Sequence, residues 1–334
     1  MKIESLFLEI TDKCNKQCEY CYQNINAVSH IHKPEMNRQL AEQIIAQAQE
    51  IGVNKIIISG GEPTLHPHFN DIVSYVIYHH MKCRINSNAS MTEKIIRTVQ
   101  INRKYEDKLE FQFTIDGYGD LHESFRGKGD YEQVKSTLKE LRKCGYGGTI
   151  ALRYNLNRTD VDEIEKVYRD FSSMATYIFL APVFGEHANK ISVEDYGCLY
   201  RYVEQKRDKK ISLFVPPLAC KIPHISENTV CSPLIDAAGG MYICQLALHR
   251  PDFFLGNLNT DSLKSLLAEG HIESVRRKLK ERNCGLKCSL KNMCEGGCKG
   301  LCTLAEGDGF CNLRKIIFIK GYKRSEYQCW GEMG

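Results

Sequence analysis

The sequence predicts an α/β protein whose main part is an open, partial (β/α)6 barrel, followed by a small, irregular, cysteine-rich domain. Two observations carry this prediction. Strand-like and helix-like segments alternate from residue 5 to about residue 184, which is typical of a parallel sheet with helical crossovers. Beyond Pro216-Pro217 the apolar pattern breaks into short segments with closely spaced cysteines. We therefore divide the chain into residues 1–215 and 216–334.

Each element has a local signal. Ser5–Thr11 is a strand-like apolar run, Asn37 is a suitable cap for a helix through Ile51, and Gly52 ends that helix. Further strands are expected at Lys55–Ser59, Lys82–Ser87, Leu109–Asp116, Thr149–Asn155 and Thr176–Val183, and further helices at Phe69–Met81, Thr92–Tyr105, Asp130–Cys144 and Asp160–Ser173.

The order of these elements favours a curved sheet. Right-handed crossovers curl parallel strands into a barrel, and this chain has too few units to close one. An open TIM-like barrel follows, with a doubly wound sheet as the alternative. After Pro182 we expect the alternation to stop, leaving one last helix over Val193–Lys210.

Composition excludes several classes of protein. The chain has 334 residues, 43% hydrophobic and 26% charged, which is ordinary for a globular protein. Its formal charge of +4 does not favour nucleic-acid binding. No apolar run is long enough for a membrane span, and the N-terminus lacks the pattern of a signal peptide. We expect a cytoplasmic protein.

The sixteen cysteines are the unusual feature. In a reducing compartment, clustered cysteines bind metal or take part in chemistry more often than they form disulfides. Three lie together near the start: Cys14, Cys18 and Cys21. Three are isolated and expected to be small buried hydrophobic residues: Cys83, Cys144 and Cys198.

The first cluster suits an open metal centre. A structural zinc site needs a fourth ligand, and no suitably spaced residue follows, whereas three cysteines on a cubane leave one iron open. A zinc loop on an unrelated α/β domain remains the alternative. The cluster follows the first strand, and polar groups end the next four strands: Gly60–Pro63, Asn86–Asn88, Asp116–Gly117, and Arg153 with Asn155. Barrel enzymes place their sites at such strand ends.

These residues together resemble the radical S-adenosylmethionine (SAM) enzymes. The resemblance rests on Cx3Cx2C with Tyr20 before the last cysteine, on Gly60-Gly61-Glu62-Pro63, and on Thr114-Ile-Asp116-Gly117 with His122 and Arg126, which is typical of the peptide-modifying branch. It implies that Cys14, Cys18 and Cys21 hold a [4Fe–4S] cluster. It also implies cleavage of SAM to a 5′-deoxyadenosyl radical that abstracts a substrate hydrogen.

The resemblance also implies contacts to SAM. Glycine would let the backbone approach the ligand, and an arginine would meet its carboxylate. The implied residues are Tyr20, Ser59, Gly60, Gly61, Glu62, Ser87, Asn88, Thr114, Asp116, Arg126 and Arg153. Ordinary strand-end polarity, and surface ion pairs for the two arginines, are the alternatives.

The last third resembles the SPASM domain, which binds auxiliary iron–sulfur clusters. The resemblance implies one [4Fe–4S] cluster on Cys231, Cys244 and Cys298, completed by Cys220 or left open, and another on Cys284, Cys288, Cys294 and Cys311. Cys302 and Cys329 stay unassigned. The interval after Cys284 is three residues where the SPASM pattern has two, which puts this ligand in doubt. A single auxiliary cluster, or a zinc ribbon over residues 284–298, remains possible.

The SPASM resemblance implies a maturase acting on a ribosomally made peptide or protein, with crosslinking or oxidation as the outcome. Because the first strand begins near residue 5, a leader peptide would need a separate recognition protein or a surface of the barrel. A flavodoxin or ferredoxin would supply the electron. Tyr242 and Gln245 are the substrate-side candidates. Gln245 cannot take a proton, which disfavours formylglycine formation, where the family has an aspartate base.

Two other classes of function compete. A radical SAM dehydrogenase or epimerase acting on a small molecule would use the same radical chemistry. A non-enzymatic iron–sulfur electron carrier or metal sensor would leave the Gly60–Pro63 motif and the polar strand ends unexplained.

Overall fold

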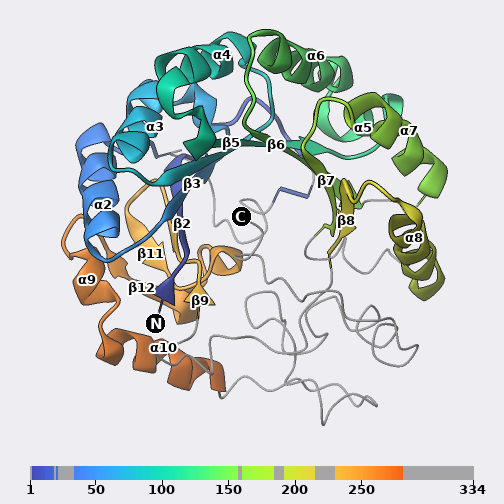
Figure 1. Ribbon diagram of the computed structural model, residues 1–334. Helices are drawn as coiled ribbons and strands as arrows, with labels where there is room; N and C mark the ends of the chain where they lie inside the picture. The colour runs from blue at the N-terminus through green and yellow to red at the C-terminus, as the bar shows by residue number, and fades with distance from the viewer. Residues whose placement is uncertain are drawn as a thin grey trace.

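The computed structural model describes residues 2–18, 20–21, 34–156, 160–183, 192–214 and 230–280. In this part of the chain, ten strands form one sheet in the order β12-β11-β10-β2-β3-β4-β5-β6-β7-β8. Strands β2 to β8 run parallel along an arc, and helices α2 to α8 cover its outer side (Figure 1). The partial barrel is confirmed, and the single helical layer excludes a doubly wound sheet.

The elements have the following bounds. The strands of the large sheet are β2 Ser5–Thr11, β3 Lys55–Gly60, β4 Lys82–Ser87, β5 Leu109–Ile115, β6 Thr149–Leu156, β7 Tyr177–Pro182, β8 Ile211–Leu213, β10 Leu234–Ile235, β11 Gly240–Tyr242 and β12 Phe254–Asn257. The α-helices are α2 Arg38–Glu50, α3 Phe69–Tyr78, α4 Thr92–Ile101, α5 Asp120–Arg126, α6 Asp130–Lys143, α7 Val161–Phe171, α8 Val193–Gln205, α9 Leu263–Leu266 and α10 Glu269–Lys280. A separate parallel pair joins β1 Lys2–Ile3 to β9 Val230–Cys231.

The two faces of the strands contact different groups. On β2, Leu6 and Leu8 are fully buried in the main apolar core between sheet and helices. Phe7, one position away, packs instead against a second cluster that contains Leu234 and Tyr242. This follows from the two-residue period of a strand. The same alternation puts polar residues such as Glu9 on the inner, concave face of the arc.

Local capping signals fix the ends of several helices. The Asn37 side chain accepts a hydrogen bond from the backbone N–H of Gln39 at 2.8 Å, and Gly52 takes a left-handed φ of 82° after the helix. Asp160 caps α7 in the same way, accepting from the N–H of Asp162 at 2.9 Å. Both helix starts agree with the sequence prediction to within one residue.

Three predicted helices are too long, and the one predicted over Phe69–Met81 ends at Tyr78. Helix α4 ends at Ile101, and a 3-10 segment, η2, follows over Arg103–Lys108. The helix predicted over Val193–Lys210 ends at Gln205, because Lys206 has extended backbone and Lys209 a left-handed φ of 51°. Lys206 is held instead by Glu165 of α7, at 2.6 Å.

The expected end of the alternation at Pro182 is wrong. After α8 the chain forms β8, which pairs parallel with β7 through Ile178 and Ile211. This adds a further strand–helix–strand crossover to the barrel. The strand was missed because it has only three residues and directly follows a run of charges.

The isolated cysteines have three different environments. Cys83 is fully buried on β4, as expected, and Cys144 is partly buried against the main core. Cys198 is exposed, which contradicts the prediction of a buried residue. On α8, residues such as Tyr196 and Leu199 face the core, and Cys198 lies on another side of the helix.

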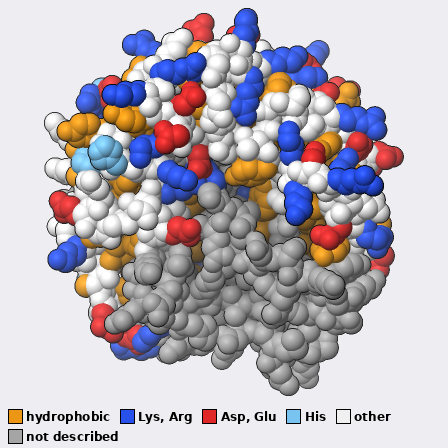
Figure 2. Space-filling view, in the orientation of Figure 1, with side chains coloured by type: hydrophobic (Ala, Val, Ile, Leu, Met, Phe, Trp, Pro, Cys, Tyr) orange, Lys and Arg blue, Asp and Glu red, His pale blue; other side chains and the backbone are white. Residues whose placement is uncertain are grey.

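The strands after residue 230 continue the barrel sheet. β10 pairs parallel with β2, with Leu234 opposite Phe7, and β11 and β12 follow antiparallel. The predicted domain boundary at residues 215–216 lies outside the described residues. Figure 2 shows basic and acidic side chains interspersed over the described part of one face, in keeping with the formal charge of +4. In the described residues, no helix has the length and apolarity that a membrane span requires.

Candidate active site

The cysteine loop, residues 12–18 and 20–21, leaves the carboxyl end of β2. Its thiols Cys14, Cys18 and Cys21 are all partly exposed and reduced. A turn joins the last two, with the N–H of Cys21 donating to the carbonyl of Cys18 at 3.1 Å. Burial raises the pKa of Cys18 to about 11, and nearby Arg126 counteracts that rise. Within the described residues, no three His, Cys, Asp or Glu side chains converge on a single metal ion.

Two glycines at the end of β3, Gly60 and Gly61, allow the backbone there to contact the backbone of the cysteine loop. The N–H of Gly61 donates to the carbonyl of Thr11 at 2.7 Å, and the N–H of Glu62 donates to that of Lys13 at 2.8 Å. A Cβ on Gly60 would lie 2.2 Å from the Thr11 oxygen, and one on Gly61 would lie 2.3 Å from the Lys13 oxygen. Glycine is therefore required here to hold the cysteine loop against β3.

Glu62 links the ends of β3 and β4. Its side chain is fully buried, and Oε1 accepts from Thr64 Oγ1 at 2.6 Å and from Ser87 Oγ at 2.9 Å. Oε2 accepts from the backbone N–H of Asn88 at 2.6 Å. Burial raises the pKa of Glu62, against the effect of these hydrogen bonds. The carboxylate is thus engaged by the protein at both oxygens.

The end of β4 also contacts the cysteine loop through side chains. Asn88 donates to Oδ1 of Asn15 at 2.9 Å, and its Nδ2 lies 3.9 Å from the sulfur of Cys14. Asn15 in turn donates to Oγ of Ser90 at 2.9 Å. The residue after the first cysteine is therefore held by the segment that follows β4.

A buried ion pair follows β5. Asp116 is fully buried, and its Oδ2 accepts from Nε of Arg126, a residue of α5 with a side chain only 10% exposed. Oδ1 accepts from Asn155 on β6 at 2.8 Å. Burial opposes the charge of Arg126, but the attraction of Asp116 outweighs it and raises the pKa of Arg126 well above its usual value. Arg126 also donates to the hydroxyl of Tyr20 at 3.4 Å.

His122 connects this pair to the start of α6. The backbone N–H of Asp116 donates to Nδ1 of His122 at 3.0 Å, and Nε2 lies 3.0 Å from Oδ2 of Asp130. Because Nδ1 is an acceptor, the ring proton is on Nε2, which donates to Asp130. The second oxygen of Asp130 lies 2.5 Å from Nζ of Lys16 in the cysteine loop.

The structure therefore brings most of the predicted residues to one edge of the sheet. Thr114 and Arg153 pair in register on β5 and β6, away from the face that packs against the helices, and Nε of Arg153 donates to Asn155 at 2.8 Å. Ser59 is buried near the end of β3. The sequence analysis did not identify Asn15, Lys16 and Asp130 as site residues. Their polarity, within the cysteine motif for the first two and shortly after Arg126 for the third, was the one feature that could have pointed to them.

The C-terminal candidates are described only in part. Tyr242 is buried, with its ring 5.4 Å from that of Phe254 in an edge contact, and Gln245 begins the 3-10 turn η5, Gln245–Ala247. Cys244, between them, is partly buried against the main core, and Cys231 lies on β9. The other predicted ligands lie outside the described residues: Cys220, Cys284, Cys288, Cys294, Cys298 and Cys311.

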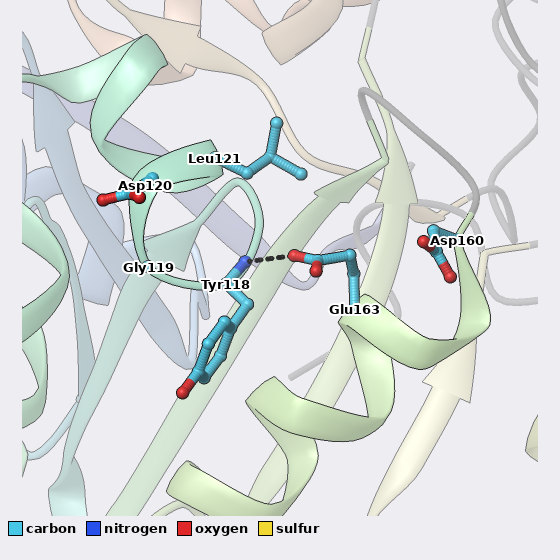
Figure 3. A pocket seen from close by; sticks show the side chains of 6 residues that line it. All are labelled: Tyr118, Gly119, Asp120, Leu121, Asp160 and Glu163. Carbon is cyan, nitrogen blue, oxygen red and sulfur yellow. Dashed lines mark hydrogen bonds between the residues drawn. The ribbon is translucent and has the colours of Figure 1, made fainter.

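A cavity of about 490 Å³ lies beside the site, between the start of α5 and the start of α7 (Figure 3). The backbone N–H of Tyr118 donates to Oε2 of Glu163 across it, at 3.3 Å. Its lining is Tyr118, Gly119, Asp120, Leu121, Asp160 and Glu163.

The partial barrel, with a three-cysteine loop clamped over its strand ends, defines a class of enzyme. Residues 8–171 match the profile of the Radical SAM superfamily, so this part of the chain is a radical SAM domain. The chain is therefore a radical SAM enzyme, a class that uses SAM and a [4Fe–4S] cluster.

Individual proteins resemble most of the chain. It is 24% identical over 311 residues to the mycofactocin maturase MftC of Mycolicibacterium smegmatis, covering 87% of this chain and 76% of that one. It is 26% identical over 318 residues to the antilisterial bacteriocin subtilosin biosynthesis protein AlbA of Bacillus subtilis, covering 88% and 67%. The structure of native anSMEcpe with bound AdoMet matches with a TM-score of 0.68 at 15% identity, covering 94% and 96%. That last likeness concerns the fold alone.

Proposed function

We propose that this chain is a radical SAM maturase that modifies a ribosomally made peptide or protein by crosslinking or oxidation. The observation that carries the proposal is the clamped cysteine loop over the strand ends, in a chain that resembles two peptide-maturation proteins over most of its length. A small-molecule dehydrogenase or epimerase would use the same loop, but neither of these relatives favours it.

Cys14, Cys18 and Cys21 are assigned to the [4Fe–4S] cluster. The donor set fits, because all three are soft sulfur ligands, reduced and partly exposed on one loop. When bound, this cluster and SAM would supply a carbon radical able to remove a hydrogen atom from the substrate.

The strand ends are assigned to SAM. Backbone groups at Ser59, Gly60 and Gly61 lie beside the cysteine loop, and Thr114 and Arg153 face the concave side of the arc. Arg153 is the better partner for the carboxylate of SAM, because Arg126 already neutralises Asp116. Tyr20, Glu62, Ser87, Asn88, Asp116 and Arg126 then act by holding the loop and the strand ends in place.

Residues 216–334 are proposed as a SPASM domain with two auxiliary [4Fe–4S] clusters. The proposal rests on the cysteine spacing, with Cys231, Cys244, Cys298 and Cys220 on one cluster and Cys284, Cys288, Cys294 and Cys311 on the other. Tyr242 and Gln245, on either side of Cys244, are proposed to face the substrate. Clusters of this kind suit the reducing cytoplasm, where a flavodoxin or ferredoxin would donate the electron and a separate protein would deliver the leader peptide.

The proposal is tested by metal content and product formation. Anaerobically reconstituted wild-type protein should hold about twelve irons per chain, and the Cys14/Cys18/Cys21→Ala variant about eight. With reductant and SAM, the wild type should release 5′-deoxyadenosine and change the mass of a peptide encoded beside its gene. Zinc in place of the eight retained irons would overturn the auxiliary clusters. Turnover of a small molecule with no modified peptide would favour the alternative.

A further inference from the structure

Two side chains between the first and second cysteines anchor the loop to two different segments of the barrel. Asn15 is bonded to Asn88 and Ser90 after β4, each at 2.9 Å. Lys16 contacts a different element, with Nζ 2.5 Å from Oδ1 of Asp130 at the start of α6. The loop is thereby tied both to the segment that follows β4 and to the start of α6.

The Lys16 contact is the more desolvated of the two. The side chain of Asp130 is 0% exposed and that of Lys16 is 18% exposed, although the residues on either side of Lys16 in the loop are exposed. Solvent therefore screens this pair far less than a surface pair. The pair is also fixed at its far end, because Oδ2 of Asp130 accepts from His122, which is itself bonded to the backbone of Asp116.

We propose that Lys16 and Asn15 are positioning residues that hold the cysteine loop in its cluster-binding shape before any metal arrives, with the Lys16–Asp130 pair as the stronger clamp. The inference rests on the proposed role of the three cysteines. Neither residue touches substrate or supplies a ligand. Their role is to limit how far Cys14 and Cys18 can move apart.

The loop supplies a matched control. Lys13 lies in the same loop and also pairs with a carboxylate, Glu35, but its side chain is 51% exposed and that of Glu35 is 28% exposed. Lys13→Met and Lys16→Met thus remove the same charge within three residues. Only the second removes a contact to a fully buried carboxylate.

The test measures thiol reactivity in the metal-free chain, so that it does not depend on a loaded enzyme. Iodoacetamide labelling of Cys14, Cys18 and Cys21 is followed by peptide mass spectrometry. Because labelling reports the opened population of the loop, we expect Lys16→Met to label Cys18 about tenfold faster than wild type, which corresponds to ~1.4 kcal/mol. Lys13→Met should label at the wild-type rate. Equal rates for wild type and Lys16→Met would overturn the proposal.

Further variants distinguish a positioning role from general damage to the fold. Asp130→Asn should raise labelling as Lys16→Met does, and the double variant should be no faster than either, because both break one contact. Lys16→Arg should restore the slow rate. Asn15→Ala, with a smaller rise, tests the second clamp if Lys16→Met proves unfolded by circular dichroism. Additive effects of Lys16→Met and Asp130→Asn would contradict a shared contact.

Iron retention gives the matching readout on the holoenzyme. We expect a chelator to strip iron from the cluster of Lys16→Met several-fold faster than from wild type or Lys13→Met, since thiolates on a looser loop dissociate more readily. If the wild type binds no iron at all, the proposed function fails. The labelling result on the metal-free chain would still show whether Lys16 restrains the cysteine loop.

Discussion

The backbone N–H of Asn88 donates to Oε2 of Glu62 at 2.6 Å, and this contact joins the ends of two adjacent strands, β3 and β4. The motif that resembles a SAM contact therefore also has a structural role. Oε1 of the same carboxylate accepts from Thr64 and Ser87. Every donor around Glu62 points at an oxygen, so the pocket is built for a carboxylate rather than for an amide.

Glu62→Gln tests this role. The amide would place N–H groups against donors that now point at oxygen, and the variant should lose about 1–3 kcal/mol of unfolding free energy. Urea unfolding of the metal-free chain measures the loss. Glu42→Gln, the same change at a surface pair with Arg38, should leave stability unchanged. A Glu62→Gln variant as stable as wild type would show that the buried hydrogen bonds are not the main role of Glu62.

Arg126→Met tests the buried ion pair after β5. Asp116 has a side-chain exposure of 0%, so removal of its counter-ion would leave a buried carboxyl group uncompensated, at a cost of about 3–5 kcal/mol. Adding Asp116→Asn should recover part of this, about 0.5–3 kcal/mol, since the uncompensated charge is removed. The coupling is measured by a double-mutant cycle in urea. Purely additive losses would mean that the two side chains do not act as a pair.

Gly61→Ala tests the contact between backbones. Its Cβ would lie 2.3 Å from the carbonyl oxygen of Lys13 and 2.8 Å from that of Asp12, so the cysteine loop must move away from β3. We expect a loss of about 1–3 kcal/mol and a weaker hold on iron. Gly270→Ala on α10 is the matched control, because nothing lies within 4 Å of its Cβ. There alanine should be neutral or stabilising.

Much of the barrel could be predicted because its signals are local. The apolar run Ser5–Thr11 and the cap at Asn37 each need only a few neighbouring residues, and both appear where expected. The short helix α5, between Gly119 and Gly127, was missed since its seven residues give no readable period. Likewise β8 is defined by pairing with β7, which is a tertiary contact.

The candidate site also combines features with a local sequence signal and features that depend on tertiary contacts. The spacing of Cys14, Cys18 and Cys21 is a local pattern, and the structure places all three on one loop over the strand ends. The motifs could not predict which polar side chains elsewhere in the chain would contact the cysteine loop. Lys16 meets Asp130 only because the barrel brings β2 and α6 together, and no pattern near either residue signals that meeting.

The last prediction concerns the pH dependence of stability and rests on a buried cluster of three charged side chains on β3, β4 and β5. Glu110 on β5 lies 2.6 Å from Nζ of Lys55 on β3 and 3.1 Å from Nε of Arg84 on β4, with all three side chains at most 8% exposed. Burial raises the pKa of Glu110, but the two cations outweigh it, so the pKa lies below its ordinary value of 4.5. The folded state therefore holds this carboxylate ionised at a pH where the unfolded chain takes up a proton.

The sign of the effect follows by linkage. The contribution of Glu110 is fully present above pH 4.5, and it is lost as the pH falls through the lower pKa of the folded state. Wild-type stability should therefore fall with pH in this range, and Glu110→Gln should be less stable at neutral pH and show a shallower fall. Urea unfolding of the metal-free chain from pH 7 down to about pH 3 measures both. If the stabilities of the two proteins fell in parallel with pH, another carboxylate would account for the acid destabilisation. If the two proteins were equally stable at neutral pH, the ion pairs of Glu110 with Lys55 and Arg84 would not contribute to stability.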